Sequence, residues 1–172
     1  SQAQIHANLK LAISGGQNEP HDAIAGAAYA VLLHPKQYAL IKSGAHSWMD
    51  AFEEYARWMS PIGMSPRRVT QDYKIGGVPI AAEARAFFMF GSGNRDAAAF
   101  AEPDLFDLGQ DRSKAISFGA GPHFCAGAWA ARCLIGQVAL PMLFERRPDL
   151  ALSGEAVFGG WAFRGPLSVP VR

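Results

Sequence analysis

The chain has 172 residues, of which 49% are hydrophobic and 18% charged, and its formal net charge is +1 at pH 7. This composition is typical of a globular domain, and the balanced charge gives no reason to expect binding to nucleic acid or to an acidic membrane surface. We find no apolar run long enough for a transmembrane segment and no signal segment at the start. Two cysteines do not make a disulfide framework, so we predict a cytoplasmic location.

The first predicted element is a helix with an interruption. Apolar residues recur at helical spacing from Gln4 to His34, but Gly15, Gly16 and Pro20 fall inside this stretch. Glycine costs about 1 kcal/mol and proline about 3 kcal/mol in a helix interior. We therefore predict a linker or a kinked, widened helix at this point.

The rest of the chain is predicted to alternate short helices with short strands. A helix capped by Ser47 is expected to run to Met59 and to stop before Pro61. The other predicted elements are a helix over residues 36–42, strands over 68–73 and 78–80, a strand or short helix over 85–90, a long loop over 91–114, a helix over 126–144, and strands over 149–152 and 167–171.

The stretch FGAGPHFCAG, residues 118–127, is the most informative motif. It places Cys125 between a glycine-rich turn and a predicted helix, where the helix dipole and free backbone N–H groups favour the thiolate. A structural zinc site wants about four ligands, and Cys133 does not stand in CxxC register with Cys125. Two interpretations remain open from the residues: an axial ligand to haem, or a buried cysteine at a glycine-rich helix entry.

Several motifs in order resemble the C-terminal part of a cytochrome P450 of bacterial type. The pattern F-x-x-G-x-H-x-C-x-G fits residues 118–127, and an E-x-x-R motif lies at Glu54 and Arg57. An Asn-Arg-Asp tripeptide at residues 94–96 also fits, and the resemblance covers nearly the whole chain. It implies a mainly α fold with small β-sheets, and it implies that residues 1–172 are the C-terminal haem-binding part of one domain whose N-terminal part is absent.

The resemblance also implies a cofactor, haem b (iron protoporphyrin IX), with Cys125 as the ligand of the iron. His123 and Arg67 would bind the two propionates, and Glu54 and Arg57 would form a buried pair that supports the loop. The residues implied to bind the haem are Phe118, Gly119, His123, Cys125, Gly127 and Arg67.

The chain departs from the family pattern in three places. Gln110 stands where members usually have an arginine that partners the Glu–Arg couple, although Arg112 lies two residues later. Ala115 stands where many bacterial members have a propionate-binding histidine. The third departure is the distal helix, where the threonine that usually relays protons is missing.

Counting back from residues 34–35, Asn18 takes the position of the usual acid and Glu19 that of the threonine, whereas a shift of one residue puts Glu19 at the acid and Pro20 at the threonine. We interpret Glu19 as the catalytic proton donor, acting through water that Asn18 orients. The alternative is that both residues only cap the helix that restarts at Pro20.

The function implied by the resemblance is a haem-thiolate monooxygenase, an oxidoreductase. It would insert one oxygen atom from O2 into a small apolar substrate, with electron transfer from a ferredoxin or another reductase. Arg112, Lys114 and Arg132 would form either a docking face for that partner or a solvated surface. Alternatives are a haem-binding module without turnover, or a peroxygenase that uses peroxide. Segments 62–64 and 158–161 are expected to line the substrate pocket or to pack in the core.

Overall fold

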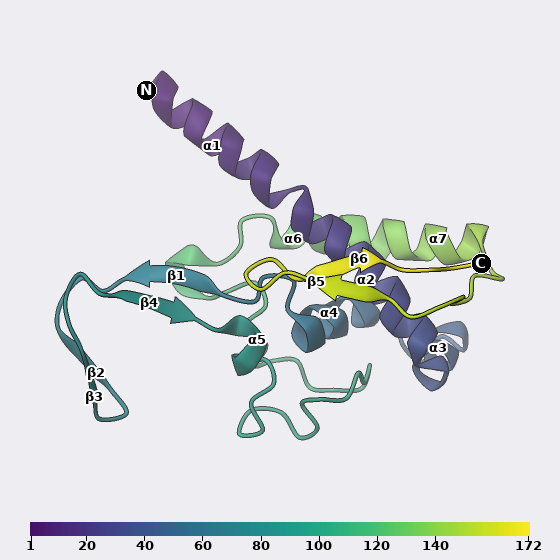
Figure 1. The fold of residues 1–172 in the computed structure, drawn as a ribbon. Helices are drawn as coiled ribbons and strands as arrows, with labels where there is room; N and C mark the ends of the chain where they lie inside the picture. Colours follow the sequence, from purple (N-terminus) through teal and green to yellow (C-terminus); the bar gives the residue numbers. More distant parts are fainter.

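The structure is a computed structural model that describes all residues 1–172. The helices gather on one side, and a two-stranded sheet extends from the other (Figure 1). The first four helices are α1 (Gln2–Gly15), α2 (Asn18–Leu33), α3 (Pro35–Lys42) and α4 (Trp48–Met59). The predicted interruption is confirmed, because α1 ends beside Gly16 and α2 begins two residues later.

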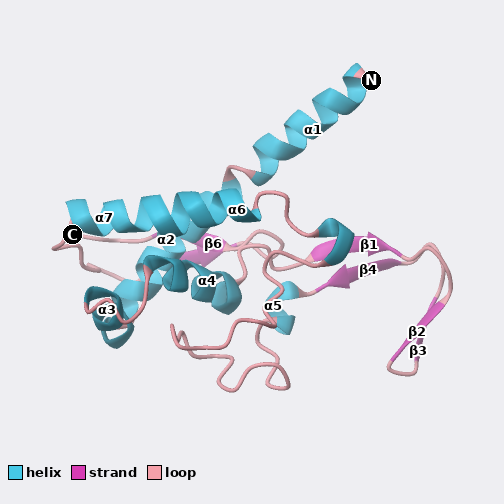
Figure 2. Cartoon of the chain, turned by 180° about the vertical axis from the view of Figure 1, so that it is seen from behind, coloured by secondary structure: helices cyan, strands magenta, loops and turns pink.

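The cysteine loop leads into one long helix near the C-terminus. It starts as α6 (Ala128–Ala131), widens into a π-helix over Arg132–Ala139, and continues as α7 (Leu140–Arg146). Pro141 explains the widening, because proline has no N–H to donate and its ring crowds the preceding turn. This helix lies along α2 and α4 (Figure 2).

The core lies where these helices meet. Its fully buried members come from α2, α4, the loop after α5 and the C-terminal helix, and they include Val31, Phe52, Tyr55, Leu108, Ile135 and Leu140. Helix α4 has a strongly one-sided apolar pattern, so it contributes most of its inner face to this core.

All three sheets are antiparallel pairs. Strand β1 (Ser65–Arg68) pairs with β4 (Arg85–Phe88), and β2 (Tyr73–Ile75) pairs with β3 (Val78–Ile80). Strand β5 (Val157–Gly159) pairs with β6 (Gly165–Ser168), which packs on α2. The helix α5 (Phe90–Gly93) and a 3₁₀ turn at Gly121–His123 complete the secondary structure.

The predicted fold class, mainly α with small sheets, is confirmed, but several boundaries are wrong. The strand predicted over 68–73 is two strands, since β1 ends at Arg68 and β2 begins at Tyr73. The predicted strand over 149–152 is reduced to a single bridge between Leu152 and Val171. The strand predicted over 167–171 lies earlier, over Gly165–Ser168, and its partner β5 falls where no strand is predicted.

Helix α1 differs from the other helices because it projects away from the body of the molecule (Figure 1). None of its residues is buried, and Ile5, Leu9, Leu11 and Ile13 are all more than half exposed. No helix combines the length and the apolar character needed to span a membrane.

Candidate functional site

The cysteine loop is a tight turn closed by its own backbone. The Cys125 amide donates to the Phe118 carbonyl at 2.9 Å, and the Phe124 amide donates to the Gly121 carbonyl at 3.0 Å. Gly119 and Gly121 have φ angles of 70° and 63°, in the left-handed region that favours glycine. The motif therefore forms a tight turn that needs glycine at these two positions, because other residues rarely adopt such φ angles.

The Cys125 thiol is exposed and not buried in the core. The backbone amides of Ala126 and Gly127 donate no hydrogen bond, so two polarised N–H groups remain free beside the sulfur. A Cβ atom built on Gly127 would meet only the Cys125 Sγ atom, at 3.8 Å, and otherwise open space. These features fit a flat group that approaches the loop and takes the thiolate as its ligand.

No cluster of three or more His, Cys, Asp or Glu side chains could hold a metal ion in this structure. A metal ion at Cys125 would therefore have to bring most of its ligands with it, as haem does. The residues of the loop thus fit the cofactor that the sequence resemblance implies.

Phe118 begins the loop, and His123 lies in its middle, at the end of the 3₁₀ turn. The Phe118 ring is half-buried against the core and meets the Phe52 ring edge to face, with the centroids 6.2 Å apart. His123 is exposed on the 3₁₀ turn and makes no hydrogen bond through its ring. It is therefore free to bind a ligand, which remains a prediction.

Helix α4 supports the loop through a buried ion pair. Arg57 Nη2 lies 2.7 Å from Glu54 Oε1 and Arg57 Nε lies 2.9 Å from Oε2, and both side chains are fully buried. The remaining Arg57 donors reach the carbonyls of Asn94, Pro103 and Leu105 at 2.7 to 3.0 Å. One residue thus satisfies three backbone carbonyls of the loop that precedes the cysteine motif.

Asn94 connects this network to the segment that enters the cysteine loop. Its side-chain amide donates to Ser60 at 2.9 Å and to Ser117 at 3.0 Å, and its carbonyl oxygen accepts from the Ile116 amide at 2.8 Å. Ser117 in turn donates to the Ala56 carbonyl at 2.8 Å. The sequence pointed to Asn94 only as part of a tripeptide, and nothing in the sequence indicated its partners.

Arg112 takes the place that the family pattern gives to an arginine at position 110. Its Nη2 atom donates to Asp50 at 2.9 Å, and its Nη1 atom lies 4.0 Å from Glu54. Burial alone would raise the pKa of Asp50, but hydrogen bonds from Ser47 and the charge of Arg112 together lower it. Arg112 is therefore part of the support network.

Arg67 lies on β1, at a groove beside the sheet. Its guanidinium donates to the Ser65 hydroxyl at 2.7 Å and to the Pro66 carbonyl at 2.8 Å, and lies 5.5 Å from the centre of the Phe88 ring. The residues that line the groove are Pro66, Arg67, Arg68, Glu83, Ala84 and Arg85. Three arginines facing one acid make the groove suitable for an anionic group.

Asn18 and Glu19 lie in the first turn of α2. Gln17 is the N-cap residue and makes no side-chain capping bond. The alternative that Asn18 and Glu19 cap the helix at Pro20 is therefore wrong, because both lie inside it.

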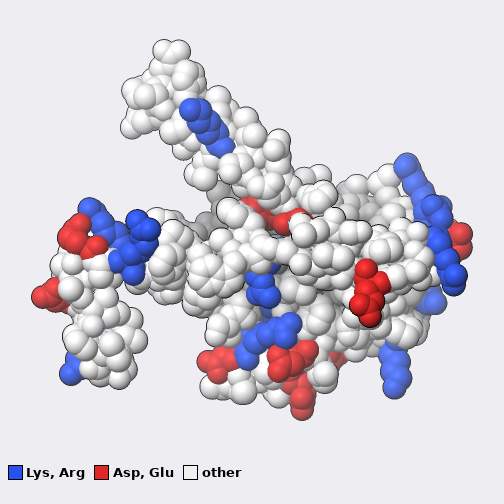
Figure 3. Space-filling view, viewed as in Figure 1, with Lys and Arg blue, Asp and Glu red and all other residues white.

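Glu19 Oε2 is buried without a hydrogen-bond partner, whereas Asn18 is exposed. Burial raises the pKa of Glu19, the nearby Asp22 raises it further, and its own backbone amide opposes this shift. Acidic atoms lie at the base of α1, where α2 begins (Figure 3).

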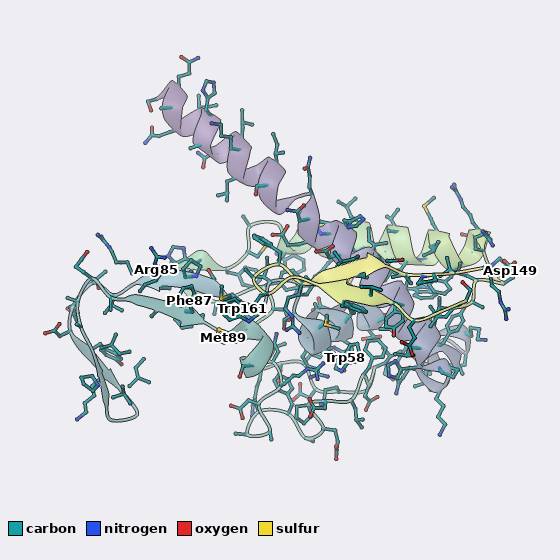
Figure 4. All side chains as sticks on the ribbon, in the orientation of Figure 1. Trp58, Arg85, Phe87, Met89, Asp149 and Trp161 are labelled. Atoms are coloured by element: carbon teal, nitrogen blue, oxygen red, sulfur yellow. The ribbon has the colours of Figure 1, made fainter.

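The two segments expected at the substrate side lie together. The Gly63 amide donates to the Ala162 carbonyl at 2.8 Å, and Ile62 forms a β-bridge with Phe163. Trp161 lies in the loop between β5 and β6, near Phe87 of β4 and Met89, which follows that strand (Figure 4). Trp161 is 69% exposed, so this side of the molecule offers an apolar surface rather than core packing.

Residues 50–146 match the family model described as Cytochrome P450. The chain is 37% identical over 154 residues to a vitamin D(3) 25-hydroxylase of Pseudonocardia autotrophica, covering 89% of this chain and 38% of that protein. It is 36% identical over 148 residues to the 6-deoxyerythronolide B hydroxylase of Saccharopolyspora erythraea, covering 84% of this chain and 36% of that protein. The chain thus spans less than half the length of these curated relatives.

The fold matches solved structures over nearly its whole length. The cytochrome P450 PksS of Bacillus subtilis 168 superposes with a TM-score of 0.92 at 30% sequence identity. This match covers 99% of the chain and 45% of PksS. The resemblance and the partial fold predicted from the sequence are therefore confirmed.

Proposed function

This chain belongs to the cytochrome P450 family, and we propose that it forms the haem-binding part of a monooxygenase. The reaction is the insertion of one oxygen atom from O2 into a small apolar substrate. The observation that carries the proposal is the exposed Cys125 thiol on a loop that is fastened to α4 through the buried residues Arg57 and Asn94. A hydrogen-bond network of this kind holds the thiol in position, although none of the residues of the network binds the cofactor itself.

The residues of the loop would hold haem b, which supplies the activation of O2 when it is bound. Cys125 would bind the iron, and the free amides of Ala126 and Gly127 would stabilise the charge on its sulfur. The missing side chain at Gly127 and the positive φ of Gly119 leave room for a flat ring. Phe118 would keep water from the sulfur on the core side.

The propionates would be bound by Arg67 and His123. Arg67 lies in a groove with two further arginines, and His123 is exposed on the 3₁₀ turn of the motif. Charge-assisted hydrogen bonds from these side chains would fix the ring's orientation.

Glu19 would hold a proton on its buried Oε2 atom and pass it toward the site of oxygen reduction. Its raised pKa supports this role, because burial favours the neutral acid that can donate. Asn18 would orient the water that completes the relay. A hydroxyl residue is absent from this turn of α2, so Glu19 would replace it.

Electrons and substrate would come from outside the chain. A ferredoxin or another reductase would deliver the electrons, and the exposed Trp161 side chain, with the half-buried Ile62 and Met64 beside it, would contact the substrate. Both cysteines are free thiols, which supports a reducing, cytoplasmic setting.

The exposed apolar side chains of α1 support a further part of this proposal. Residues 1–172 would be the C-terminal part of one domain, and additional chain would cover α1 and close the distal side of the haem. The match covers only 36–38% of the length of the two curated relatives, which is consistent with a chain that is one part of a larger domain.

The central experiment is the spectrum of the reduced, CO-bound protein after reconstitution with haem. We expect the red-shifted Soret band of a thiolate ligand, and we expect Cys125→Ala to abolish it. Cys133→Ala is the matched control, because this second exposed thiol should leave the band unchanged. A thiolate band that persists in Cys125→Ala would contradict the assignment.

Turnover separates the monooxygenase from a haem-binding module and from a peroxygenase. We expect product in the presence of O2, a ferredoxin and its reductase, and Glu19→Gln should uncouple O2 consumption from product formation. Product formed only with hydrogen peroxide would favour a peroxygenase. Unchanged coupling in Glu19→Gln would remove the catalytic role of Glu19.

A further inference from the structure

The Arg132 side chain lies against two aromatic rings and one carboxylate. Its guanidinium carbon is 4.6 Å from the centre of the Phe118 ring and 5.3 Å from that of Trp129, within the range of cation–π contacts. Its Nε atom donates to Glu53 Oε1 in a close ion pair. Both charged side chains are 24% exposed, so Arg132 offers little charge for docking a redox partner.

The Phe118 ring links this ion pair to the cysteine. The carbonyl of Phe118 accepts the hydrogen bond of the Cys125 amide at 2.9 Å, and its ring packs between the core and the Arg132 guanidinium. A change at Arg132 therefore acts on the residue that closes the cysteine loop.

The charges of Arg132 and Glu53 are only weakly screened by solvent, because both side chains are largely buried. Charges that are three-quarters buried are poorly screened, so each acts over a longer distance than it would in water. A cation near the cysteine stabilises the state with one more electron, and an anion destabilises it. With Arg132 and Glu53 paired, the two influences largely cancel.

We propose that the Glu53–Arg132 pair is a positioning and charge-balancing element, which keeps either charge from shifting the reduction potential of the group bound at Cys125. This inference rests on the proposed function, because it needs a redox group on the thiolate. Arg132 holds the Phe118 ring in place, and Glu53 offsets the positive charge that this contact brings to the first residue of the cysteine loop.

The test is the midpoint reduction potential of the haem-reconstituted protein, measured by spectroelectrochemical titration. We expect Arg132→Gln to lower the potential, because it leaves Glu53 as an unpaired anion. Glu53→Gln should raise it, because it leaves an unpaired cation. The double variant should lie between the two single variants, and Lys114→Gln, which removes one exposed charge near the loop, should cause no shift.

The sign of the two shifts distinguishes charge balancing from simple support. Shifts in the same direction, or no shift, would overturn the proposal. If the variants only loosened the loop, losing the positive charge and losing the negative charge would have the same effect on the potential. If Arg132→Gln does not fold, the nearly isosteric Glu53→Gln still decides by the direction of its shift. A parent protein without the thiolate CO band would overturn the proposed function as well, whereas a normal band with absent or parallel shifts would overturn this inference alone.

Discussion

The cysteine loop and helix α1 are built in opposite ways. The loop is exposed at its thiol but is fastened from behind by Glu54, Arg57 and Asn94, none of which is accessible to solvent. Helix α1 has a complete capping box at Ser1 and regular backbone bonds, yet it buries no side chain. The comparison teaches that the cysteine loop is held by buried residues of this chain, whereas the apolar side chains of α1 have no such partners in the structure.

The largest expected effect comes from breaking the buried pair. Arg57→Gln leaves Glu54 as an uncompensated buried charge and frees three carbonyls, so we expect a loss of about 3–5 kcal/mol in the free energy of unfolding. Urea unfolding would measure this loss.

The matched control is Arg68→Gln. Arg68 pairs with Glu83 at 3.2 Å, but both side chains are about 70% exposed, so we expect a change within ~0.5 kcal/mol. Equal losses in the two variants would show that the buried network does not support the loop as described.

Next in size is a contrast between two glycines of the distal helices. A Cβ atom at Gly26 would fall 1.8 Å from the Tyr55 hydroxyl, so Gly26→Ala should cost about 1–3 kcal/mol of unfolding free energy. Nothing lies within 4 Å of a Cβ atom at Gly15 in α1, so Gly15→Ala should stabilise the protein by roughly 0.5 kcal/mol. Thermal unfolding of the two variants would measure both changes, and a loss in Gly15→Ala would show that α1 is packed against something.

A smaller effect is expected from pH. The pKa of Glu19 is raised in the folded chain, mainly by burial, so the folded state binds this proton more tightly than the unfolded chain does. Its contribution to stability is fully present below the ordinary value of 4.5 and is lost as the pH rises through the folded pKa. Urea unfolding across this window should show a fall in the parent that is absent in Glu19→Gln. Parallel pH profiles would contradict the assigned burial of Oε2.

The smallest effect is expected on α1 itself. Leu9 is 56% exposed, so Leu9→Ser in the 172-residue chain should change the unfolding free energy by no more than ~0.5 kcal/mol. Leu140→Ala, at a fully buried position of the C-terminal helix, should cost about 2–5 kcal/mol. A comparable loss in Leu9→Ser would mean that α1 is covered in solution.

Local chemistry made much of this fold predictable. Ser47 does cap α4, and Gly76 and Gly77 adopt the positive φ angles that join β2 to β3. The glycines of the cysteine loop likewise turn as their residue type suggests. Boundaries were harder, because the end of β1 depends on pairing with β4 and not on the strand-forming residues that follow Arg68.

The residues of the candidate site that belong to a short sequence motif could be predicted. The contacts between residues far apart in the sequence could not. The resemblance of short motifs pointed to Cys125, Glu54 and Arg57, and the structure has Glu54 and Arg57 as a buried pair on α4 and Cys125 as an exposed thiol in the loop. Asn94 contacts Ser60 and Ser117, which lie 34 and 23 positions away in the sequence. A local sequence pattern does not indicate contacts over such separations. The same holds for Arg132, which the sequence offered as a surface charge and the structure pairs with Glu53.

Asn94 has a consequence for any attempt to transplant this cysteine loop. Its side chain gives two hydrogens and takes one, so a carboxylate of the same shape could not replace it. One of its partners, Ser60, ends α4 in a left-handed conformation with a φ of 51°. The loop, the end of α4 and the Asn94 side chain therefore have to be transplanted together. A graft of residues 118–127 alone would lack the hydrogen bonds that anchor the loop.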